Sequence, residues 1–177
     1  EVFEEYYAGR NTLNLGFSGD RTQHVLWRLL NGELPPQVKP KVAVIMIGTN
    51  NTGQAMQKAD ETAAGIKAIV TLLRDRRPEM KILLLGIFPR GVQAHDPKRK
   101  LNEEINALVA KLVDQQHIHY LDISKEFLSG DGALPKSIMP DALHPNAKGY
   151  QIWAEAVEEK IAELGGWQKI PAPPAGL

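Results

Sequence analysis

The residues with the most evident chemistry are an aspartate and a histidine near the C-terminal end of the chain. The segment DALHP places Asp141 three residues before His144. An imidazole titrates near neutral pH, so it can accept a proton as a general base and return it as a general acid. A carboxylate that accepts a hydrogen bond from one ring nitrogen orients the ring. We predict that Asp141 orients His144 as a general base; the alternative is an acidic residue near a helix start beside an incidental histidine.

Two segments that precede this pair in the chain, both predicted to be turns, carry groups that can bind a developing negative charge. Gly19 has no side chain and lies just before a predicted helix, so its backbone N–H can approach a ligand closely. Asn50 carries a side-chain amide that can donate hydrogen bonds to an oxyanion. Both residue types are also common in turns, which is the alternative explanation. Gly19 and Asn50 are therefore candidates for anion binding.

Four short apolar runs predict the β-strands that position these turns. The runs VAVIMIG and KILLLGIF are almost wholly apolar, which is typical of strands that are covered on both faces. The four predicted strands cover residues 12–17, 42–48, 81–88 and 117–123.

Helical patterns alternate with these strands. Apolar residues recur at helical spacing over residues 21–30, 59–77, 100–116 and 147–164. Strands that alternate with helices indicate βαβ units and a parallel sheet with helices on both faces. We therefore predict an α/β fold, a three-layer α/β/α sandwich of flavodoxin-like type with a central parallel sheet. Ligands of such sheets bind beyond the carboxyl ends of the strands, where the turns that hold Gly19, Asn50 and His144 can meet.

Composition excludes several classes of site and partner. The chain has 177 residues, which favours a single domain. Lys and Arg number 21, as do Asp and Glu, so there is no electrostatic reason to expect a nucleic-acid partner. There is no cysteine, which excludes disulfides, thiolate metal sites and a cysteine nucleophile but assigns no compartment. No apolar run approaches the roughly 20 residues of a transmembrane segment.

Several of these segments resemble one protein family in their order and separation. NLGFSGDRT, IGTNN and DALHPNAKGY resemble the second, third and fifth sequence blocks of the SGNH (GDSL-type) hydrolases. RTQHVLWRLLNGEL, KPKVAVIMIGTNN and LLLGIFPRG resemble in particular the catalytic-subunit branch of the platelet-activating-factor acetylhydrolases. The resemblance covers residues 10–160 and implies the fold predicted above.

The resemblance implies a serine esterase that needs no cofactor and no metal. Asp141 and His144 match the Asp and His of the family's catalytic triad, and Gly19 and Asn50 match two residues of its oxyanion hole. The implied substrate is a small-molecule carboxylic ester, lipid and carbohydrate esters included, with a short acyl group such as acetyl. Dimers are common in this branch, so a homodimer is a further expectation.

The family's nucleophile, the serine of a Gly-Asp-Ser motif after the first strand, does not occur in this sequence. Ser18 lies beside Gly19 but lacks the second glycine of a Gly-x-Ser-x-Gly turn, because Asp20 stands there. The other serines fit caps, turns or loops and lie at positions 124, 129 and 137. We expect the first strand and its serine to precede Glu1, with EVFEEYY as the helix after them. A chain that began at Glu1 would lack a central strand, so we expect it to be nearly inactive and poorly folded.

Further expectations concern a competing function, a histidine pair and the C-terminal end. A chain without a nucleophile would be a non-catalytic binding or assembly module of flavodoxin-like shape. His117 and His119 lie on one face of a predicted strand, and a half-exposed edge strand explains them better than a metal site. The hydrolase-like domain is expected to span residues 1–166, followed by a Pro-rich tail over residues 167–177 that is extended or loose.

Overall fold

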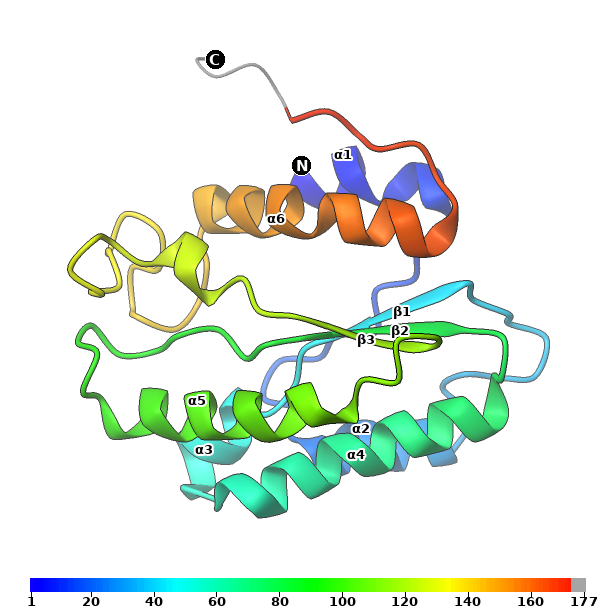
Figure 1. Cartoon of the computed structure of the whole chain (residues 1–177), viewed down its shortest axis with the longest axis horizontal. Helices are drawn as coiled ribbons and strands as arrows, with labels where there is room; N and C mark the ends of the chain where they lie inside the picture. The colour runs from blue at the N-terminus through cyan, green and yellow to red at the C-terminus, as the bar shows by residue number, and fades with distance from the viewer. Residues whose placement is uncertain (173–177) are drawn as a thin grey trace.

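The computed structural model describes residues 1–172, and its centre is a three-stranded parallel sheet (Figure 1). The strands, in their spatial order, are β1 (Val42–Ile45), β2 (Lys81–Leu85) and β3 (Ile118–Leu121). Val42 of β1 pairs with Lys81 of β2, and Ile82 of β2 pairs with Ile118 of β3. The parallel sheet that the alternating elements predicted is therefore present, with β2 at its centre.

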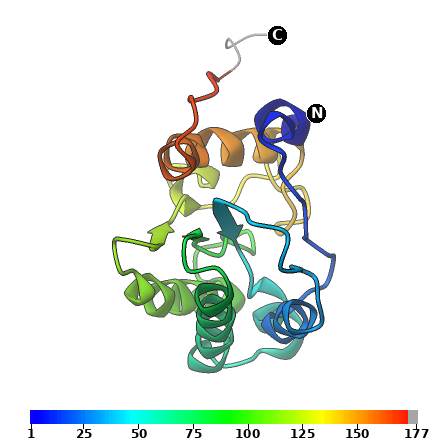
Figure 2. The ribbon, with the colours of Figure 1, turned by 90° about the vertical axis from the view of Figure 1, so that its right-hand side faces the viewer.

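Helices cover both faces of this sheet, as Figure 1 and Figure 2 show. One face carries α1 (Val2–Tyr6) and α6 (Ala147–Gly165). The other face carries α2 (Thr22–Leu30), α3 (Thr49–Ala55), α4 (Ala59–Arg76) and α5 (Pro97–Val109). Three short 3-10 helices are η1 (Ala8–Arg10), η2 (Ala110–Leu112) and η3 (Ser124–Phe127). The predicted three-layer α/β/α sandwich is confirmed. Over the described part of the chain, no helix combines the length and the apolar character that a membrane crossing needs.

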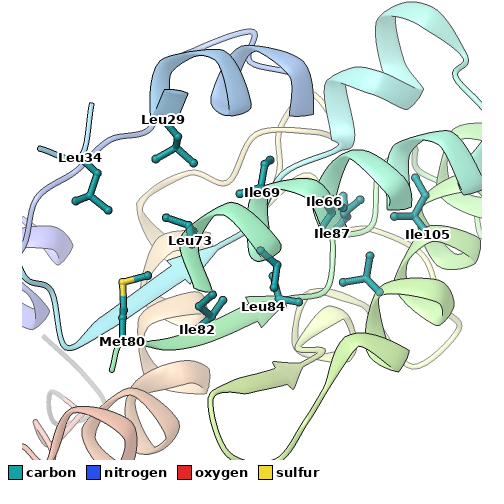
Figure 3. Close-up of a cluster of buried hydrophobic side chains, with 12 residues drawn as sticks. Leu29, Leu34, Ile66, Ile69, Leu73, Met80, Ile82, Leu84, Ile87 and Ile105 are labelled. Carbon is teal, nitrogen blue, oxygen red and sulfur yellow. The ribbon is translucent and has the colours of Figure 1, made fainter. Parts of the chain in front are cut away.

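The central strand shows why its sequence is continuously apolar. Ile82 and Leu84 belong to the core cluster between the sheet and the layer of α2, α4 and α5, whereas Leu83 and Leu85 belong to the cluster beneath α6. Successive residues of a strand point to opposite faces, so a strand that is buried on both faces has no polar position. Figure 3 shows Ile69 and Leu73 of α4 gathered with Leu29 of α2 and with Ile82 and Leu84 of β2 in the first of these clusters.

The prediction of a strand over residues 12–17 is wrong. Within residues 1–172 the sheet has three strands, and β1 pairs with β2 alone, so this segment has no strand beside it. Leu13 and Phe17 are exposed, and Asn14 Oδ1 accepts a hydrogen bond from Gly16 N (3.0 Å) in a local turn. A strand needs a neighbour that pairs its backbone groups, and an apolar run by itself does not supply one.

The other predicted elements are present with shifted ends. Each of the three strands ends earlier than its apolar run. The helix predicted over residues 100–116 begins at Pro97, because Asp96 Oδ1 accepts hydrogen bonds from the backbone N–H groups of Lys98 (2.9 Å) and Arg99 (3.2 Å). It gives way to η2 before the predicted end. The predicted N-terminal helix is present as α1.

A buried ion pair joins η1 to α6 and holds the chain beyond α6. Arg10 donates to Glu158 Oε1 (2.6 Å) and Oε2 (2.9 Å). Glu158 Oε1 also accepts from the backbone N–H of Ile170 (2.7 Å), and Arg10 donates to the backbone oxygen of Gln168 (3.2 Å). The tail is therefore extended and attached as far as it is described, and residues 173–177 of the predicted tail lie outside the described residues.

We expect Ile69→Ala to lower the free energy of unfolding by about 2–5 kcal/mol, because it leaves a cavity between α4 and the sheet. Ile69 is 0% exposed and belongs to the same core cluster as Ile82 and Leu84. Leu30→Ala is the control, because Leu30 is 53% exposed and its truncation should change that free energy by no more than about 0.5 kcal/mol. Urea denaturation followed by circular dichroism measures both variants, and equal losses would contradict this description of the core.

Candidate active site

The segments that hold the predicted site residues gather beyond one end of the sheet. Figure 1 shows α3, the chain that leaves β2 and the loop before α6 on the same side of the molecule. Since α3 follows β1 and the strands are parallel, this side is the carboxyl edge of the sheet. It is the edge at which an open α/β sheet binds its ligands.

Asp141 and His144 form a direct hydrogen-bonded pair. His144 Nδ1 lies 2.6 Å from Asp141 Oδ2, and the backbone N–H groups of His144 (2.8 Å) and Leu143 (3.0 Å) donate to Asp141 Oδ1. The backbone N–H of His144, followed by its ring, lowers the pKa of Asp141 to about 2, so the carboxyl is ionised and Nδ1 carries the proton. The His144 side chain is 74% exposed, which leaves Nε2 open for proton transfer.

The loop that carries this pair is held on both sides. Ala142 O accepts a hydrogen bond from the backbone N–H of Gly91 (2.9 Å), and Ala142 itself has a positive φ of 56°. After the histidine, Asn146 caps α6 by accepting from Gly149 N (3.0 Å). His144 therefore lies in a constrained turn directly before a long helix.

Asn50 lies in the first turn of α3 and contacts the turn that holds Gly19. Its side-chain Nδ2 donates to the backbone oxygen of Asp20 (2.9 Å), which leaves the second N–H of the amide for another acceptor. Gly19 has a φ of +81°, a conformation that most other residues adopt only at a cost in free energy. The structure therefore brings the two predicted anion-binding turns together.

Asn51, which the sequence did not single out, anchors this contact. It is buried, its Oδ1 accepts from Thr22 N (3.1 Å), and its Nδ2 donates to Thr22 Oγ1 (3.1 Å) and to Gln57 Oε1 (2.7 Å). Thr22 is the first residue of α2, directly after the turn that holds Gly19. The second asparagine of GTNN therefore ties the start of α3 to the start of α2, and the doubled asparagine was the available signal.

Arg28 holds the same turn from its other side. Its guanidinium binds both carboxylate oxygens of Asp20, with Nη1 2.9 Å from Oδ1 and Nη2 2.6 Å from Oδ2. It also lies over the ring of Phe17, with Cζ 4.4 Å from the ring centre. The hydrogen bond to Asp20 is the main cause that raises the pKa of Arg28, so the cation persists at all pH values of interest. The turn between Phe17 and Asp20 is thus fixed by a bidentate ion pair.

Arg90 and Gly91 connect the two halves of the predicted site. Arg90 Nη1 donates to the backbone oxygen of Thr49 (2.7 Å), the residue before Asn50. Gly91 N donates to Ala142 O (2.9 Å), within the loop of Asp141 and His144. The oxyanion candidates and the Asp–His pair therefore belong to one hydrogen-bonded assembly of loops.

Two buried asparagines of α5 support the segment that precedes Arg90. Asn106 accepts from Ile87 N (2.7 Å) and donates to Ile87 O (3.0 Å), so it replaces a strand neighbour. Asn102 donates to Phe88 O (3.2 Å) and accepts from Thr52 Oγ1 (2.8 Å) on α3. Sequence reasoning treated this helix by its apolar positions and missed both residues, whose polar side chains lie in the interior.

Two serines have local roles in turns. Ser124 begins η3, and its backbone N–H donates to Asp122 Oδ1 (2.8 Å). The hydroxyl of Ser129 donates to Asp131 Oδ1 (2.6 Å). Ser124 agrees with the expectation of a cap or turn residue, and Ser129 agrees with the expectation of a loop residue. Ser18 lies in the exposed turn beside Gly19.

His119 lies on β3 and His117 lies directly before it, and the structure of this pair differs in part from its prediction. β3 is an edge strand of the described sheet, as expected, but His119 is only 9% exposed rather than half exposed. Burial, followed by the charge of Lys160, lowers the pKa of His119. Within residues 1–172, no three His, Asp or Glu side chains lie close enough to hold a metal ion.

A separate cleft of about 360 Å³ lies between α5 and the chain around the end of β3. Its lining includes Tyr120, Asp122 and Leu128, with Asn106 of α5 at its wall. None of the four predicted site residues lines this cleft. The cleft therefore lies apart from the four predicted site residues, but Arg99, Asn102 and Asn106, which support the loops of the site, line it.

Comparison with known protein families gives a match over most of the chain. Residues 1–152 match the GDSL-like Lipase/Acylhydrolase family. The chain belongs to this family. The resemblance of its sequence blocks to the GDSL-type hydrolases is thereby confirmed.

Individual relatives of this GDSL-like chain extend the comparison. Human platelet-activating factor acetylhydrolase IB subunit alpha1 is 39% identical over 165 residues, covering 93% of this chain and 69% of that protein. A GDSL-like lipase from Bacteroides thetaiotaomicron has a TM-score of 0.77 at 19% identity, covering 92% of this chain and 80% of the other. An acetylxylan esterase from Geobacillus stearothermophilus, in a catalytic mutant with alanine in place of a serine, has a TM-score of 0.69 at 20% identity, covering 97% and 80%. The two structures share the fold of this chain.

We expect the carboxyl of Asp141 to titrate at about 2, below its ordinary value of 3.8, because His144 stabilises the charged form. A folded-state pKa below the unfolded value favours the fold above pH 3.8, and that contribution is lost as the pH falls toward 2. In His144→Ala the ring is absent and the backbone N–H remains, so the pKa should rise part of the way toward 3.8. Carbon-13 NMR titration of the aspartate carboxyls measures this shift.

Asp131 is the matched control for that titration. Its pKa is lowered by the hydroxyl of Ser129, independently of His144, and should be the same in both proteins. An ordinary pKa for Asp141 in the unmodified chain would show that the pair does not exist in solution.

Proposed function

We propose that this GDSL-like protein is a serine esterase that cleaves small carboxylic esters. His144 is the general base, Asp141 orients it, and Gly19 and Asn50 bind the oxyanion. The observation that carries the proposal is the Asp141–His144 contact of 2.6 Å with an exposed ring, because it leaves Nε2 as the free proton acceptor.

The reaction follows from the groups available at the carboxyl edge. A serine hydroxyl attacks the ester carbonyl carbon while Nε2 of His144 takes its proton, and the carbonyl oxygen becomes an oxyanion. The N–H of Gly19 and the free N–H of Asn50 stabilise that charge. The alcohol leaves with the proton from His144, and the acyl group remains on the serine. Water, deprotonated by His144, then releases the carboxylic acid and restores the serine.

The nucleophile in this proposal is a serine at the end of a further strand, of the Gly-Asp-Ser type, from outside the 177 residues. The open side of β1 supports this, because β1 pairs with β2 alone in the described chain and its Val44 is 41% exposed. A strand added in parallel there would end beside the turn of Asn50. Leu13 and Phe17, exposed in the segment with no strand neighbour, would gain an apolar surface to pack on. The serine that is replaced in the catalytic mutant of the acetylxylan esterase agrees with a serine nucleophile.

The proposed substrate class is an ester with a short acyl group, acetyl in the first place. The names of the relatives support this, since one is a platelet-activating factor acetylhydrolase subunit and another an acetylxylan esterase. The proposed alcohol part is a lipid or a carbohydrate. Initial rates over p-nitrophenyl esters from acetate to octanoate measure the acyl preference, and a maximum at the longest chain would contradict it.

We expect Asn50→Ala to lower kcat for p-nitrophenyl acetate by about 10²–10³-fold, the usual loss for one oxyanion donor, and His144→Ala to lower it further. Both are measured on the natural full-length protein. Asn31→Ala is the control, because Asn31 lies at the exposed C-terminal end of α2 and its amide bonds only Trp27 O (2.7 Å) in the described chain. Its kcat should equal that of the unmodified protein.

A fluorophosphonate probe distinguishes the origin of the nucleophile. It should label one serine outside the 177 residues, as read by peptide mass spectrometry. A label on Ser18 would overturn the proposed origin, and a full-length protein that neither reacts with the probe nor hydrolyses any of these esters would support the non-catalytic module instead.

A further inference from the structure

We infer that Arg90 is a positioning residue of the esterase site. Its guanidinium fixes the position of the turn of Asn50 relative to the loop of His144. This role rests on the proposed function. Arg90 touches neither of the oxyanion donors nor the Asp–His pair through its side chain, so it would act through the backbone of Thr49 and Ala142.

The side chain of Arg90 binds the start of α3 at one residue. Nη1 donates to Thr49 O (2.7 Å) and to Thr49 Oγ1 (3.2 Å). The carbonyl of Thr49 and the N–H of Asn50 belong to the same planar peptide unit, so fixing the oxygen also fixes the backbone from which the Asn50 amide projects. A charged donor makes this a stronger hydrogen bond than a neutral one would be.

Gly53 provides the surface on which the guanidinium lies. A Cβ added at Gly53 would be 2.3 Å from Arg90 Nη1 and 2.9 Å from both Cζ and Nη2. Any other residue at this position of α3 would therefore displace the guanidinium. The sequence TNNTGQ thus carries a helix glycine, normally unfavourable, at the point where Arg90 needs access to Thr49.

The backbone of Arg90 is fixed from the opposite side by Arg99. Arg99 is buried, and it donates from Nε to Arg90 O (3.1 Å) and from Nη2 to Gly91 O (2.7 Å). Gly91 N in turn donates to Ala142 O (2.9 Å). Arg90 and Gly91 therefore link Thr49, through the side chain of Arg90, to the histidine loop, through the backbone N–H of Gly91.

The charge of Arg90 argues for a specific role. Among residues 1–172, no carboxylate lies within ion-pair distance of its guanidinium, while Arg10 and Arg28 both have such partners. Burial lowers the pKa of Arg90, and the more distant Asp96 opposes this only in part. Partial burial of a cation without an ion pair costs free energy. A neutral residue would avoid that cost. The hydrogen bonds of Arg90 to Thr49 therefore explain why an arginine stands at this position.

The role predicts a characteristic kinetic effect. An oxyanion exists only in the transition state and the tetrahedral intermediate, so a misplaced donor raises the barrier without weakening ester binding. Arg90→Ala should therefore lower kcat for p-nitrophenyl acetate by about 10–100-fold, the range for a misplacement of about 1 Å, and leave KM within about twofold.

A double-mutant cycle with Gly53→Ala tests the inference without relying on one variant. Gly53→Ala keeps the arginine and adds a helix-favouring residue, but its Cβ would push the flexible end of Arg90 away from Thr49. It should lower kcat as Arg90→Ala does. In the Arg90→Ala background the clash is gone, so adding Gly53→Ala should leave kcat unchanged. Gly130→Ala is the control, because no atom lies within 4 Å of a Cβ there, and its kcat should equal the unmodified value.

Added guanidinium ion separates positioning from general support of the fold. It should restore part of kcat in Arg90→Ala by occupying the vacated position against Gly53, and should not restore kcat in Asn50→Ala. Arg90→Lys keeps the charge but not the planar head, so it should stay well below the unmodified kcat.

The outcomes separate this inference from the function on which it rests. An unmodified full-length protein without esterase activity overturns both. If Asn50→Ala is impaired but Arg90→Ala and Gly53→Ala keep the unmodified kcat, only the role of Arg90 is overturned. The role of Arg90 would also be overturned if the two substitutions lowered kcat additively in the double variant. A rise in KM with kcat unchanged would overturn it as well.

Discussion

The constraint on which the site depends is that the backbone must find new hydrogen-bond partners where it leaves the sheet. Ile87, just beyond β2, is buried and has both its N–H and its C=O paired by the side chain of Asn106. Arg99 then donates hydrogen bonds to the carbonyl oxygens of Arg90 and Gly91. A buried backbone group without a partner would cost about 1–3 kcal/mol, so these side chains of α5 determine the path of the segment. That segment is the one that joins the two halves of the site.

The same principle extends from α5 to the reacting groups. Loops are normally the mobile part of an α/β protein, but here each loop of the site is tied to a helix by a polar or charged side chain. Asn51 ties α3 to the start of α2, Arg28 fixes the turn at Asp20, and Asn146 caps α6 directly after His144. Hydrogen-bond donors that are fixed before the substrate arrives stabilise an oxyanion most effectively, because they do not have to reorganise. The fold and the proposed chemistry are therefore parts of one network.

How much of this could be predicted from the sequence depends on how local each interaction is. Asp141 and His144 are only three residues apart, and each strand is marked by a continuous apolar run. Both the contact and the three strands could therefore be predicted from the sequence. The strand predicted over residues 12–17 was wrong because a strand needs a neighbour to pair with, and no strand of the described residues lies beside this segment. Asn51 was missed because its partner Thr22 is distant in sequence, and the doubled asparagine of GTNN does not show which of the two side chains is buried. The supporting network is the part that only the fold reveals.

The most direct measurement of the central claim is a crystal structure of the natural full-length protein after reaction with a methyl phosphonate ester inhibitor. The account predicts a phosphonylated serine on a strand that pairs with β1. One phosphonyl oxygen should lie about 2.7–3.1 Å from Gly19 N and Asn50 Nδ2, and Nε2 of His144 should lie within hydrogen-bond reach of the serine oxygen. An adduct whose oxygen contacts neither Gly19 nor Asn50, or a His144 ring turned away from the modified serine, would contradict it.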